Sequence, residues 1–433
     1  MQATHRTFFR NIGAMAGATA VSQGILFLTS PFLTRLYDPK AVGLAGSLFS
    51  LVLIASVTTG LRLDQASVGA RTDADAYQLA ALSLLASPLT ATISALVLVL
   101  TLSDRQAGGP GILPTMAWMW LMLVLYQGYS TFRYLGLRGE RFGAIGLTTI
   151  MQQSGRALFP LAAAPILPGA AGLLLSEVGG IAVGASQLAR NQWQRVWVES
   201  RKLTRSAVAA LIRGYRDFPI VGVPSSLLNA AAQGLALPLI ATTFGAGPAG
   251  QFALAARVVS APATLVGRSV SDAFYARIAL LARERPAEVR PLFLKMCLAL
   301  LVASIGLAVL IVGIAYFGFN RVFGTNWGPA GRLAIALLPS TMAALVVSPV
   351  SSVVLVLGGQ LAKLGYDIAT LGVLTGVITC ARVAAWPLER TVWAFSAGQA
   401  TAYLFYFGVL LHLVTRLSRS NSSVQGPPEA DPA

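Results

Sequence analysis

Long apolar runs recur along the whole 433-residue chain, and most are about as long as a membrane-spanning helix. A helix needs about 20 apolar residues to cross a hydrocarbon core of roughly 30 Å. Hydrophobic residues make up 55% of the chain and charged residues 11%, against roughly 25% charged residues in soluble domains. The runs are continuous and do not alternate, which favours helices over a barrel. The sequence therefore predicts an all-α polytopic membrane protein.

Twelve spans follow from these runs. The first follows Arg6 and Arg10 but continues past Phe32, too long for a signal peptide, so we expect a retained helix. The predicted spans are 12–33, 41–61, 79–102, 113–135, 143–165, 168–189, 217–240, 249–270, 292–318, 329–357, 365–386 and 391–415.

The spans divide the chain into two predicted lobes. Residues 1–190 form an N-terminal six-helix lobe and residues 217–415 a C-terminal one. Between them, residues 191–216 form a basic amphipathic cytoplasmic linker, and residues 416–433 a disordered, Pro- and Ser-rich cytoplasmic tail.

The charge pattern orients these spans. The chain has 32 basic and 16 acidic residues, a net charge of +16. In a soluble protein this surplus would indicate nucleic acid, but here the cations fall mostly in loops, so no nucleic-acid partner is expected. Lys and Arg concentrate at the N-terminus, in the tail and in loops after even-numbered spans. The positive-inside rule then places both termini in the cytoplasm and supports an even number of spans.

The linker mixes tryptophans with cations. Trp193, Trp197, Leu211 and Ile212 are interspersed with about six basic residues in "NQWQRVWVESRKLTRSAVAALIRGYRDF". Such a segment is typical of an amphipathic helix lying on the inner leaflet. A plain orienting linker is the alternative, and the sequence leaves both open.

The two halves echo each other at their first hairpin. When the chain is shifted by 207 residues, "PFLTRLYDPKAVGL" lies over "PLIATTFGAGPAGQ". Pro31 then meets Pro238, and Gly43 meets Gly250. The shared residues are typical of a turn, whereas Arg35 has no charged counterpart. The echo therefore indicates repeated architecture.

A second echo lies in the fifth span of each half. Arg156 precedes Pro160 in "GRALFPL", and Arg382 precedes Pro387 in "ARVAAWPL". Six plus six spans keep their orientation, so the repeats would be parallel. Repeat transporters hold substrate between their halves and alternate access by rocking one half against the other.

Several charged residues fall within or near the ends of the predicted spans. An arginine at the bilayer centre costs at least about 2.5–3.5 kcal/mol, so it normally faces a bundle interior or a wet cavity. The alternatives are an internal ion pair, or snorkelling to the headgroups from a helix end. Arg156 lies some 13 residues into its predicted span, where snorkelling is harder.

Deep cations outnumber deep acids, and a cationic interior favours an anionic guest. The arginine fork suits phosphate, so phosphate esters and pyrophosphates are the expected class. The candidate substrate-binding residues of this cationic cavity are Arg156, Arg257, Arg382, Arg268, Arg62 and Arg35. The candidate ion-coupling acids are Glu177, Asp64 and Asp272. Glu177 has an alternative role as the ion-pair partner of an interior arginine such as Arg156.

Catalytic machinery has no signature here. The chain contains no GxxxxGK[ST] motif, and no Ser/His/Asp or paired-carboxylate arrangement stands out. Cys297 and Cys380 sit in apolar runs, and His5 and His412 are isolated, so neither a metal nor another cofactor is expected. We expect a transporter that runs on a gradient and is not an enzyme.

Two blocks resemble a known family. "LTSPFLTRLYDPKAVGLAGSLFSLVLIASVTTGLRLDQASV" and "IATTFGAGPAGQFALAARVVSAPATLVGRSVSDAFYARIA" are similar to the first hairpin and the seventh-to-eighth helix region of the oligosaccharide flippases. These are the Wzx-type polysaccharide biosynthesis proteins of the multidrug/oligosaccharidyl-lipid/polysaccharide exporter superfamily. Many members have Glu where this chain has Asp64, the shorter acid.

The resemblance implies twelve or more helices in two six-helix lobes around a central, often cationic cavity. It implies flipping of an undecaprenyl-pyrophosphate-linked oligosaccharide from the cytoplasmic to the periplasmic leaflet of the bacterial inner membrane, for O-antigen or exopolysaccharide synthesis. A polysaccharide polymerase and glycosyltransferases would be partners. A cation-coupled multidrug exporter of the same superfamily is the alternative. A membrane glycosyltransferase or polymerase fits less well, because no carboxylate or metal chemistry stands out.

Overall fold

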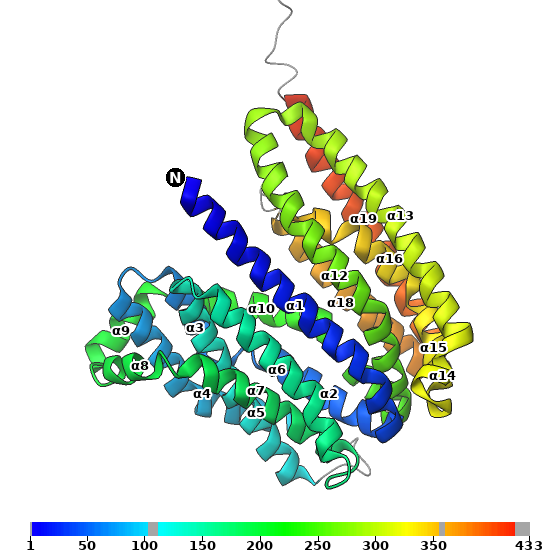
Figure 1. Cartoon of the computed structure of the whole chain (residues 1–433), viewed down its shortest axis with the longest axis horizontal. Helices are drawn as coiled ribbons and strands as arrows, with labels where there is room; N and C mark the ends of the chain where they lie inside the picture. The colour runs from blue at the N-terminus through cyan, green and yellow to red at the C-terminus, as the bar shows by residue number, and fades with distance from the viewer. Residues whose placement is uncertain (1, 103–110, 355–359, 421–433) are drawn as a thin grey trace, which may run out of the picture. The chain divides into compact units, whose positions relative to one another are not determined.

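The computed structural model describes residues 2–102, 111–354 and 360–420, and the regular structure there is helical throughout (Figure 1). The first half contains α1 (Gln2–Leu36), α2 (Pro39–Ala55), η1 (Thr59–Arg62), α3 (Leu63–Ala66), η2 (Ser67–Gly69), α4 (Asp73–Leu102), α5 (Ile112–Arg138), α6 (Phe142–Ala163), α7 (Ala170–Ala189), α8 (Trp193–Ser200) and α9 (Arg205–Gly214).

The second half repeats long helices and short breaks. It contains η3 (Phe218–Gly222), α10 (Val223–Gly234), α11 (Ala236–Phe244), α12 (Ala246–Glu284), η4 (Pro286–Glu288), α13 (Val289–Gly313), η5 (Ile314–Gly318), α14 (Phe319–Phe323), η6 (Thr325–Trp327), α15 (Gly328–Ala336), α16 (Leu338–Val347), η7 (Pro349–Ser352), α18 (Gln360–Val383) and α19 (Leu388–Ser420).

Each of the twelve predicted spans falls on one of these helices or on a pair bent at a short break. Five helices and three bent pairs in the described ranges are long and apolar enough to cross a membrane. The other four spans fall on α1, α5, α6 and α12, which have 35, 27, 22 and 39 residues. At about 1.5 Å per residue, even the shortest reaches across a bilayer core. The prediction of an all-α polytopic membrane protein is confirmed.

Two predicted segments lie partly outside the described residues. The tenth span was expected to end at 357, and residues 355–357 lie outside the described part of the structure. The tail was expected to begin at 416, but α19 continues as a helix to Ser420, and residues 421–433 lie outside the described part.

The turn between α1 and α2 is built by Asp38 and its neighbours. The side chain of Asp38 accepts a hydrogen bond from the Ala41 amide at 2.7 Å and so caps α2. Pro39 occupies the first turn of that helix, where a missing amide hydrogen costs nothing. Tyr37 is buried, and its hydroxyl donates to the carbonyl oxygen of Pro160 at 2.8 Å. The polar stretch around residue 38 therefore stops one helix and starts the next.

The equivalent turn between α11 and α12 packs against this one. Helix α12 begins at Ala246, 207 residues after α2 begins at Pro39. A Cβ added at Gly43 would overlap the carbonyl oxygen of Ala246, and a Cβ added at Gly250 would overlap that of Pro39. The two contacts are reciprocal, as at an interface with two-fold symmetry. The 207-residue echo thus corresponds to two turns that meet backbone to backbone.

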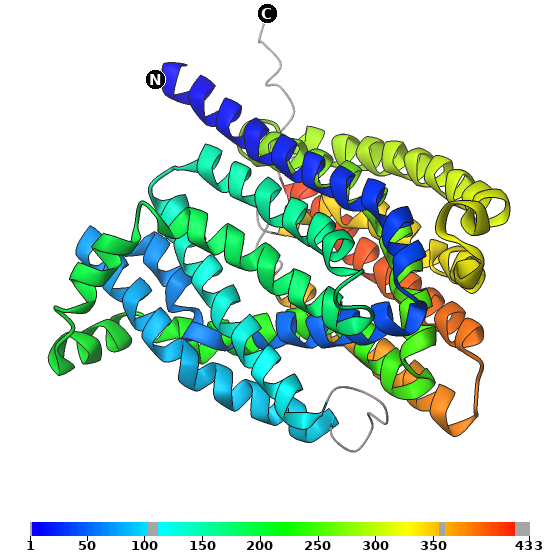
Figure 2. The ribbon, with the colours of Figure 1, turned by 60° about the horizontal axis from the view of Figure 1, so that its bottom comes forward.

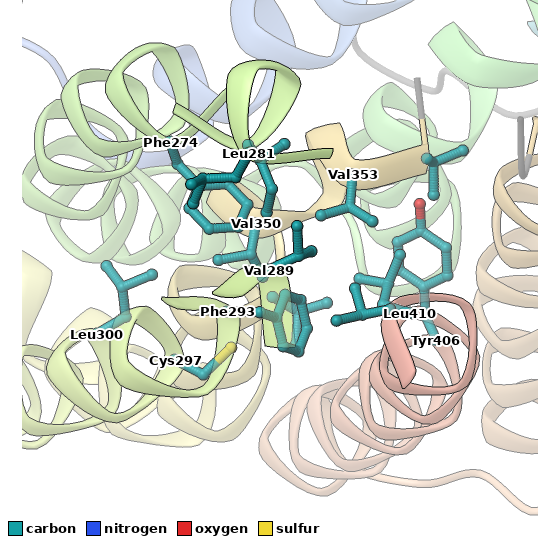
Figure 3. Packing of buried hydrophobic residues seen from close by; sticks show 14 of the residues in the cluster. Phe274, Leu281, Val289, Phe293, Cys297, Leu300, Val350, Val353, Tyr406 and Leu410 are labelled. Atoms are coloured by element: carbon teal, nitrogen blue, oxygen red, sulfur yellow. The ribbon is translucent and has the colours of Figure 1, made fainter. Parts of the chain in front are cut away.

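The chain forms two compact units. Unit 1 comprises Met1–Ala253 with Val322–Trp327, and unit 2 comprises Leu254–Arg321 with Gly328–Ala433. The linker and helices α10 and α11 therefore pack with the first six spans in unit 1. Unit 2 has a core of Phe274, Phe293, Val350 and Leu410 with their neighbours, contributed by α12, α13, η7 and α19 (Figure 3).

The linker is docked on unit 1. Val196 of α8 and Leu211 of α9 are buried in the hydrophobic cluster around Phe132. The side chain of Gln78 donates to Glu199 at 3.3 Å. Helices α8 and α9 lie beside the start of α4, at the end of unit 1 away from the turn between α1 and α2 (Figures 1 and 2). These contacts hold the linker as a folded part of the unit.

Candidate functional site

Helices α6 and α7 approach closely because small residues line their contact. A Cβ added at Gly155 would lie 3.1 Å from the Cα of Gly180. A Cβ added at Gly179 would lie 2.7 Å from the ring of Phe159. Small residues at such contacts let two helix backbones come together within a membrane. The approach brings charged side chains of the two helices within reach of each other.

Arg156 and Glu177 form an ion pair across this contact. Nε of Arg156 lies 2.5 Å from Oε2 of Glu177, and its Nη2 donates to Oε1 at 3.0 Å. The guanidinium also donates from Nη1 to the side-chain oxygen of Gln153 at 3.2 Å and lies 4.6 Å from the ring centre of Phe49 on α2. The side chains of the pair are 20% and 21% exposed.

This contact is the ion pair named as the alternative role of Glu177. The carboxylate holds the deepest predicted cation of the first half and compensates its charge. Only the contact from Nη2 to Oε1 is a hydrogen bond, because Nε of Arg156 and Oε2 of Glu177 have no hydrogen-bond partner among the described residues, and their contact is a close ion pair. The contribution of Arg156 to a cationic interior is therefore offset by its neighbour.

The second span of unit 1 breaks just before Asp64. Gly60, Leu61 and Arg62 have φ angles of 67°, 55° and 61°, all in the left-handed region. Glycine adopts this region freely, whereas a residue with a Cβ pays of order 1–3 kcal/mol. The helices on either side of the break meet at 47°. The break therefore persists only because its surroundings hold it.

A buried polar network from α4 and α5 holds the break. Thr59 donates to the Gln127 side-chain oxygen at 3.1 Å, and the Gln127 amide donates to Ser83 at 2.7 Å and to Thr131 at 3.1 Å. A Cβ added at Gly60 would overlap the side chains of Ser83 and Gln127. The residue at position 60 must therefore be glycine for both its φ angle and its contacts.

Asp64 lies at the start of the helix after the break. It is only 3% exposed, and its Oδ2 accepts a hydrogen bond from the Ser130 hydroxyl at 2.6 Å. Its Oδ1 is buried without a hydrogen-bond partner among the described residues, as is Nε of Arg62. A buried ionised oxygen without a partner is costly, so this carboxyl is suited to holding a proton or a small cation.

Among the described residues, no group of three or more His, Cys, Asp or Glu side chains gathers at one place. Asp64 provides one negative charge, which matches a monovalent cation in charge. Broken transmembrane helices are places where transporters bind coupling ions.

The remaining predicted site residues lie elsewhere along the chain than the Arg156–Glu177 pair and the helix break at Gly60. Arg35 lies in the last turn of α1, and Arg382 is the second-last residue of α18, which ends earlier than the predicted span. Both are exposed, as is Arg257 on α12. Arg268 and Asp272 lie on α12, but their side chains are outside the described part of the structure.

Several residues of these sites carried no signal in the sequence. Ser130, Gln127 and Ser83 are ordinary polar residues on long apolar helices. Phe49 resembles any other core aromatic. Gly60 in "TTGLRLD" is the exception, since a glycine next to an in-span charge is consistent with a break.

Neither a protein-family model nor a curated protein matches this chain. Solved structures do match its fold over nearly its whole length. One, described as the inward-facing conformation of a multidrug resistance MATE family transporter of the MOP superfamily, has a TM-score of 0.67 and 16% identity. That alignment covers 92% of this chain and 96% of the other. MOP is the superfamily that the sequence resemblance names.

Two further solved structures are similar to this chain in fold over nearly its whole length. A MOP superfamily transporter from Pyrococcus furiosus, described as having a binding pocket of reverse polarity that suggests a different function, has a TM-score of 0.54 and 15% identity. Its alignment covers 94% of this chain and 96% of that one. A MATE transporter from Vibrio cholerae has a TM-score of 0.51 and 16% identity, covering 97% and 98%. The chain therefore has the fold of MOP superfamily transporters and is a multi-pass membrane protein.

Proposed function

We propose that this protein is a secondary transporter that exports amphipathic compounds by alternating access. The full-length likeness to a multidrug resistance MATE transporter is the observation that carries this proposal. The break between α2 and α3 supports it, because discontinuous helices are typical of transporters that couple substrate to an ion. In this proposal the chain catalyses no covalent chemistry and lies in the bacterial inner membrane with both termini in the cytoplasm.

Asp64 is the proposed coupling residue. It is buried, it has one oxygen held by Ser130, and its other oxygen is without a partner among the described residues. Glu177 is less suited to coupling, because the positive charge of Arg156 lies against both of its oxygens, although only Oε1 accepts a hydrogen bond. Binding of a proton or Na⁺ at Asp64 would neutralise the carboxylate and remove the cost of burying it.

The compensated arginine supports a drug-like substrate over an anionic one. With Arg156 paired to Glu177, the described interior of unit 1 offers one buried acid, Asp64, with the half-buried Arg62 near it, among hydroxyls, amides and aromatic rings. Aromatic faces and carboxylates attract cations. Amphipathic cations are therefore the substrate class that we propose first.

A lipid-linked oligosaccharide flippase is the second candidate. Two sequence blocks resemble Wzx-type flippases, and exposed arginines remain at positions 35, 257 and 382. In this reading those arginines, with Arg62 and Arg268, bind the pyrophosphate, and a polymerase and glycosyltransferases act with the protein. Different pocket polarity within one fold is what the description of the Pyrococcus furiosus transporter reports for that protein.

A deletion strain separates the two candidates. If the protein exports drugs, the strain becomes more sensitive to amphipathic cations, and purified protein in proteoliposomes drives their efflux under an imposed gradient. If it is a flippase, drug sensitivity is unchanged and a lipid-linked oligosaccharide accumulates in the membrane. Accumulation of that intermediate without drug sensitivity would overturn the exporter proposal. Normal flipping by the Arg156→Ala variant in inverted vesicles would show that Arg156 is not part of the flippase binding site.

A further inference from the structure

The docked linker presents a pair of tryptophans on its outer side. Trp193 and Trp197 are 49% and 51% exposed, although Val196 between them is buried in unit 1. Their rings stack with centroids 6.3 Å apart, and the guanidinium of Arg201 lies 5.2 Å from the ring centre of Trp197. Tryptophan beside arginine is the combination that favours the boundary between headgroups and acyl chains.

The same segment is strongly cationic. Seven basic residues and one acidic residue lie between positions 190 and 216. The single acid, Glu199, is held by Lys202 at 2.5 Å and by Gln78 at 3.3 Å. The seven cations are all exposed: Arg190, Arg195, Arg201, Lys202, Arg205, Arg213 and Arg216.

The linker joins two apolar segments that cross the membrane. Helix α7 ends at Ala189, and the bent span of α10 and α11 begins at Phe218. Residues between them must therefore lie at a membrane surface. Figures 1 and 2 show α8 and α9 at the end of unit 1 away from the turn between α1 and α2.

A pocket of about 470 Å³ opens between α4 and α8. Its lining includes Asp73, Tyr77, Gln194, Arg195, Val198 and Glu199. Both carboxylates are already engaged, since Asp73 binds Arg138 at 2.9 Å and Glu199 binds Lys202. Arg195 lies 6.0 Å from the ring centre of Tyr77 and forms no ion pair with any described residue. The pocket thus contains one guanidinium without an anionic partner.

We propose that α8 and α9 bind anionic phospholipid of the cytoplasmic leaflet, with one headgroup phosphate on Arg195 in this pocket. The guanidinium fork suits a phosphodiester, and Gln194 and Tyr77 offer further polar contacts. The stacked tryptophans lie at the boundary of the acyl chains, and the other cations attract the surrounding anionic headgroups. This surface belongs to unit 1 and is independent of which compound the protein transports.

Quenching of tryptophan fluorescence by brominated lipids tests the proposal. Full-length protein is reconstituted into mixed vesicles of phosphatidylglycerol and phosphatidylcholine in which either one lipid or the other is brominated. The quenching that belongs to Trp193 and Trp197 is the difference in fluorescence quenching between the wild type and the double variant Trp193→Phe/Trp197→Phe. We expect the wild type to prefer the anionic lipid by about tenfold or more, because each nearby cation contributes up to about fivefold. Raising the salt to about 0.5 M should reduce this preference by screening.

Three sets of substitutions locate the binding surface. Arg195→Gln should lower the preference by about fivefold, and Arg201→Gln/Arg205→Gln/Arg213→Gln should lower it further. The matched control is Lys40→Gln/Arg321→Gln/Arg390→Gln, which removes three exposed cations from α2, α14 and α19, near connections expected on the other side of the membrane. The control should keep the wild-type preference. Thermal unfolding of each variant shows that it is folded.

Either of two results would overturn the proposal. One is equal quenching of the wild-type pair by both lipids, or none by either. The other is a control variant that loses the preference as far as the linker variants do. An unchanged lipid preference in Arg195→Gln would show that no headgroup phosphate binds Arg195 in the pocket.

Discussion

Arg156 on α6 and Glu177 on α7 are bound to each other by two contacts, at 2.5 Å and 3.0 Å. Each would be costly alone in this largely buried place, and together they leave no net charge. The pair therefore links two helices whose glycines allow them to pack closely.

Removing one member of this pair should destabilise unit 1. Glu177→Gln leaves Arg156 without its carboxylate, and we expect the free energy of unfolding to fall by about 3 kcal/mol. The double variant Arg156→Gln/Glu177→Gln should recover most of that loss, because no uncompensated charge remains. Unfolding in detergent solution measures both.

An exposed ion pair provides the control. Arg332 and Glu389 lie 3.1 Å apart with side chains 66% and 46% exposed. Glu389→Gln should change stability by about 0.5 kcal/mol or less, because water screens the pair. A Glu177→Gln variant as stable as Glu389→Gln would show that the buried pair contributes no more to stability than the exposed pair does.

The facing glycines of the two equivalent turns give a second prediction. Gly43→Ala and Gly250→Ala each place a Cβ against a backbone carbonyl that no rotamer change can move. We expect each to cost about 3 kcal/mol or more. Gly247→Ala, in the same turn of α12, has nothing within 4 Å of the new Cβ and should be neutral or slightly stabilising. Thermal unfolding compares the three, and equal melting temperatures would refute the close contact.

The linker supplies a prediction about pH. The hydrogen bond from Lys202, with a further one from Gln78, lowers the pKa of Glu199 below its ordinary value of 4.5. A carboxyl with a lowered pKa stabilises the fold above pH 4.5, and this contribution is lost as pH falls through the lowered value. The wild type should therefore exceed Glu199→Gln in stability at neutral pH by about 0.5 kcal/mol, and the difference should vanish in acid.

Melting temperatures of the two proteins between pH about 7 and about 3 measure this difference. Lys202→Gln removes the main cause of the lowered pKa and serves as the control. Glu199→Gln placed on the Lys202→Gln background should have little further effect. A gap between wild type and Glu199→Gln that widens in acid would contradict a lowered pKa for Glu199.

The helical layout could be predicted because bilayer thickness sets the length of a span. All twelve predicted spans fall on helices or bent pairs for this reason. The pairing of Arg156 with Glu177 was one of two open alternatives, since hydropathy locates a charge along a helix but does not determine its neighbours. The docking of Val196 and Leu211 on unit 1 could not be predicted from the linker, because its alternating apolar and basic residues suit lipid and protein alike.

The break at Gly60 depends on residues far away in the chain. Leu61 and Arg62 have no local reason for a positive φ, and the break that they form lies beside Gly60, where Gln127 of α5 fills the space that a side chain would need. The contact between Ser130 and Asp64 likewise joins residues 66 positions apart. No local pattern indicates such partners, so the sequence could name Asp64 as a candidate coupling acid but could not indicate the residues that contact it.

Asp64→Asn should uncouple transport from its ion gradient while leaving the fold intact. An amide at this position can still accept the hydrogen bond from Ser130, and it adds no buried charge, so stability should be unchanged within about 1 kcal/mol. In proteoliposomes, efflux by the wild type should rise under an imposed proton or Na⁺ gradient, and the gradient that works identifies the ion. The variant should lose this response but still exchange substrate without a gradient. Ser130→Ala keeps the carboxylate and should weaken the response without abolishing it. An Asp64→Asn variant that responds to the gradient like the wild type would exclude this residue from coupling.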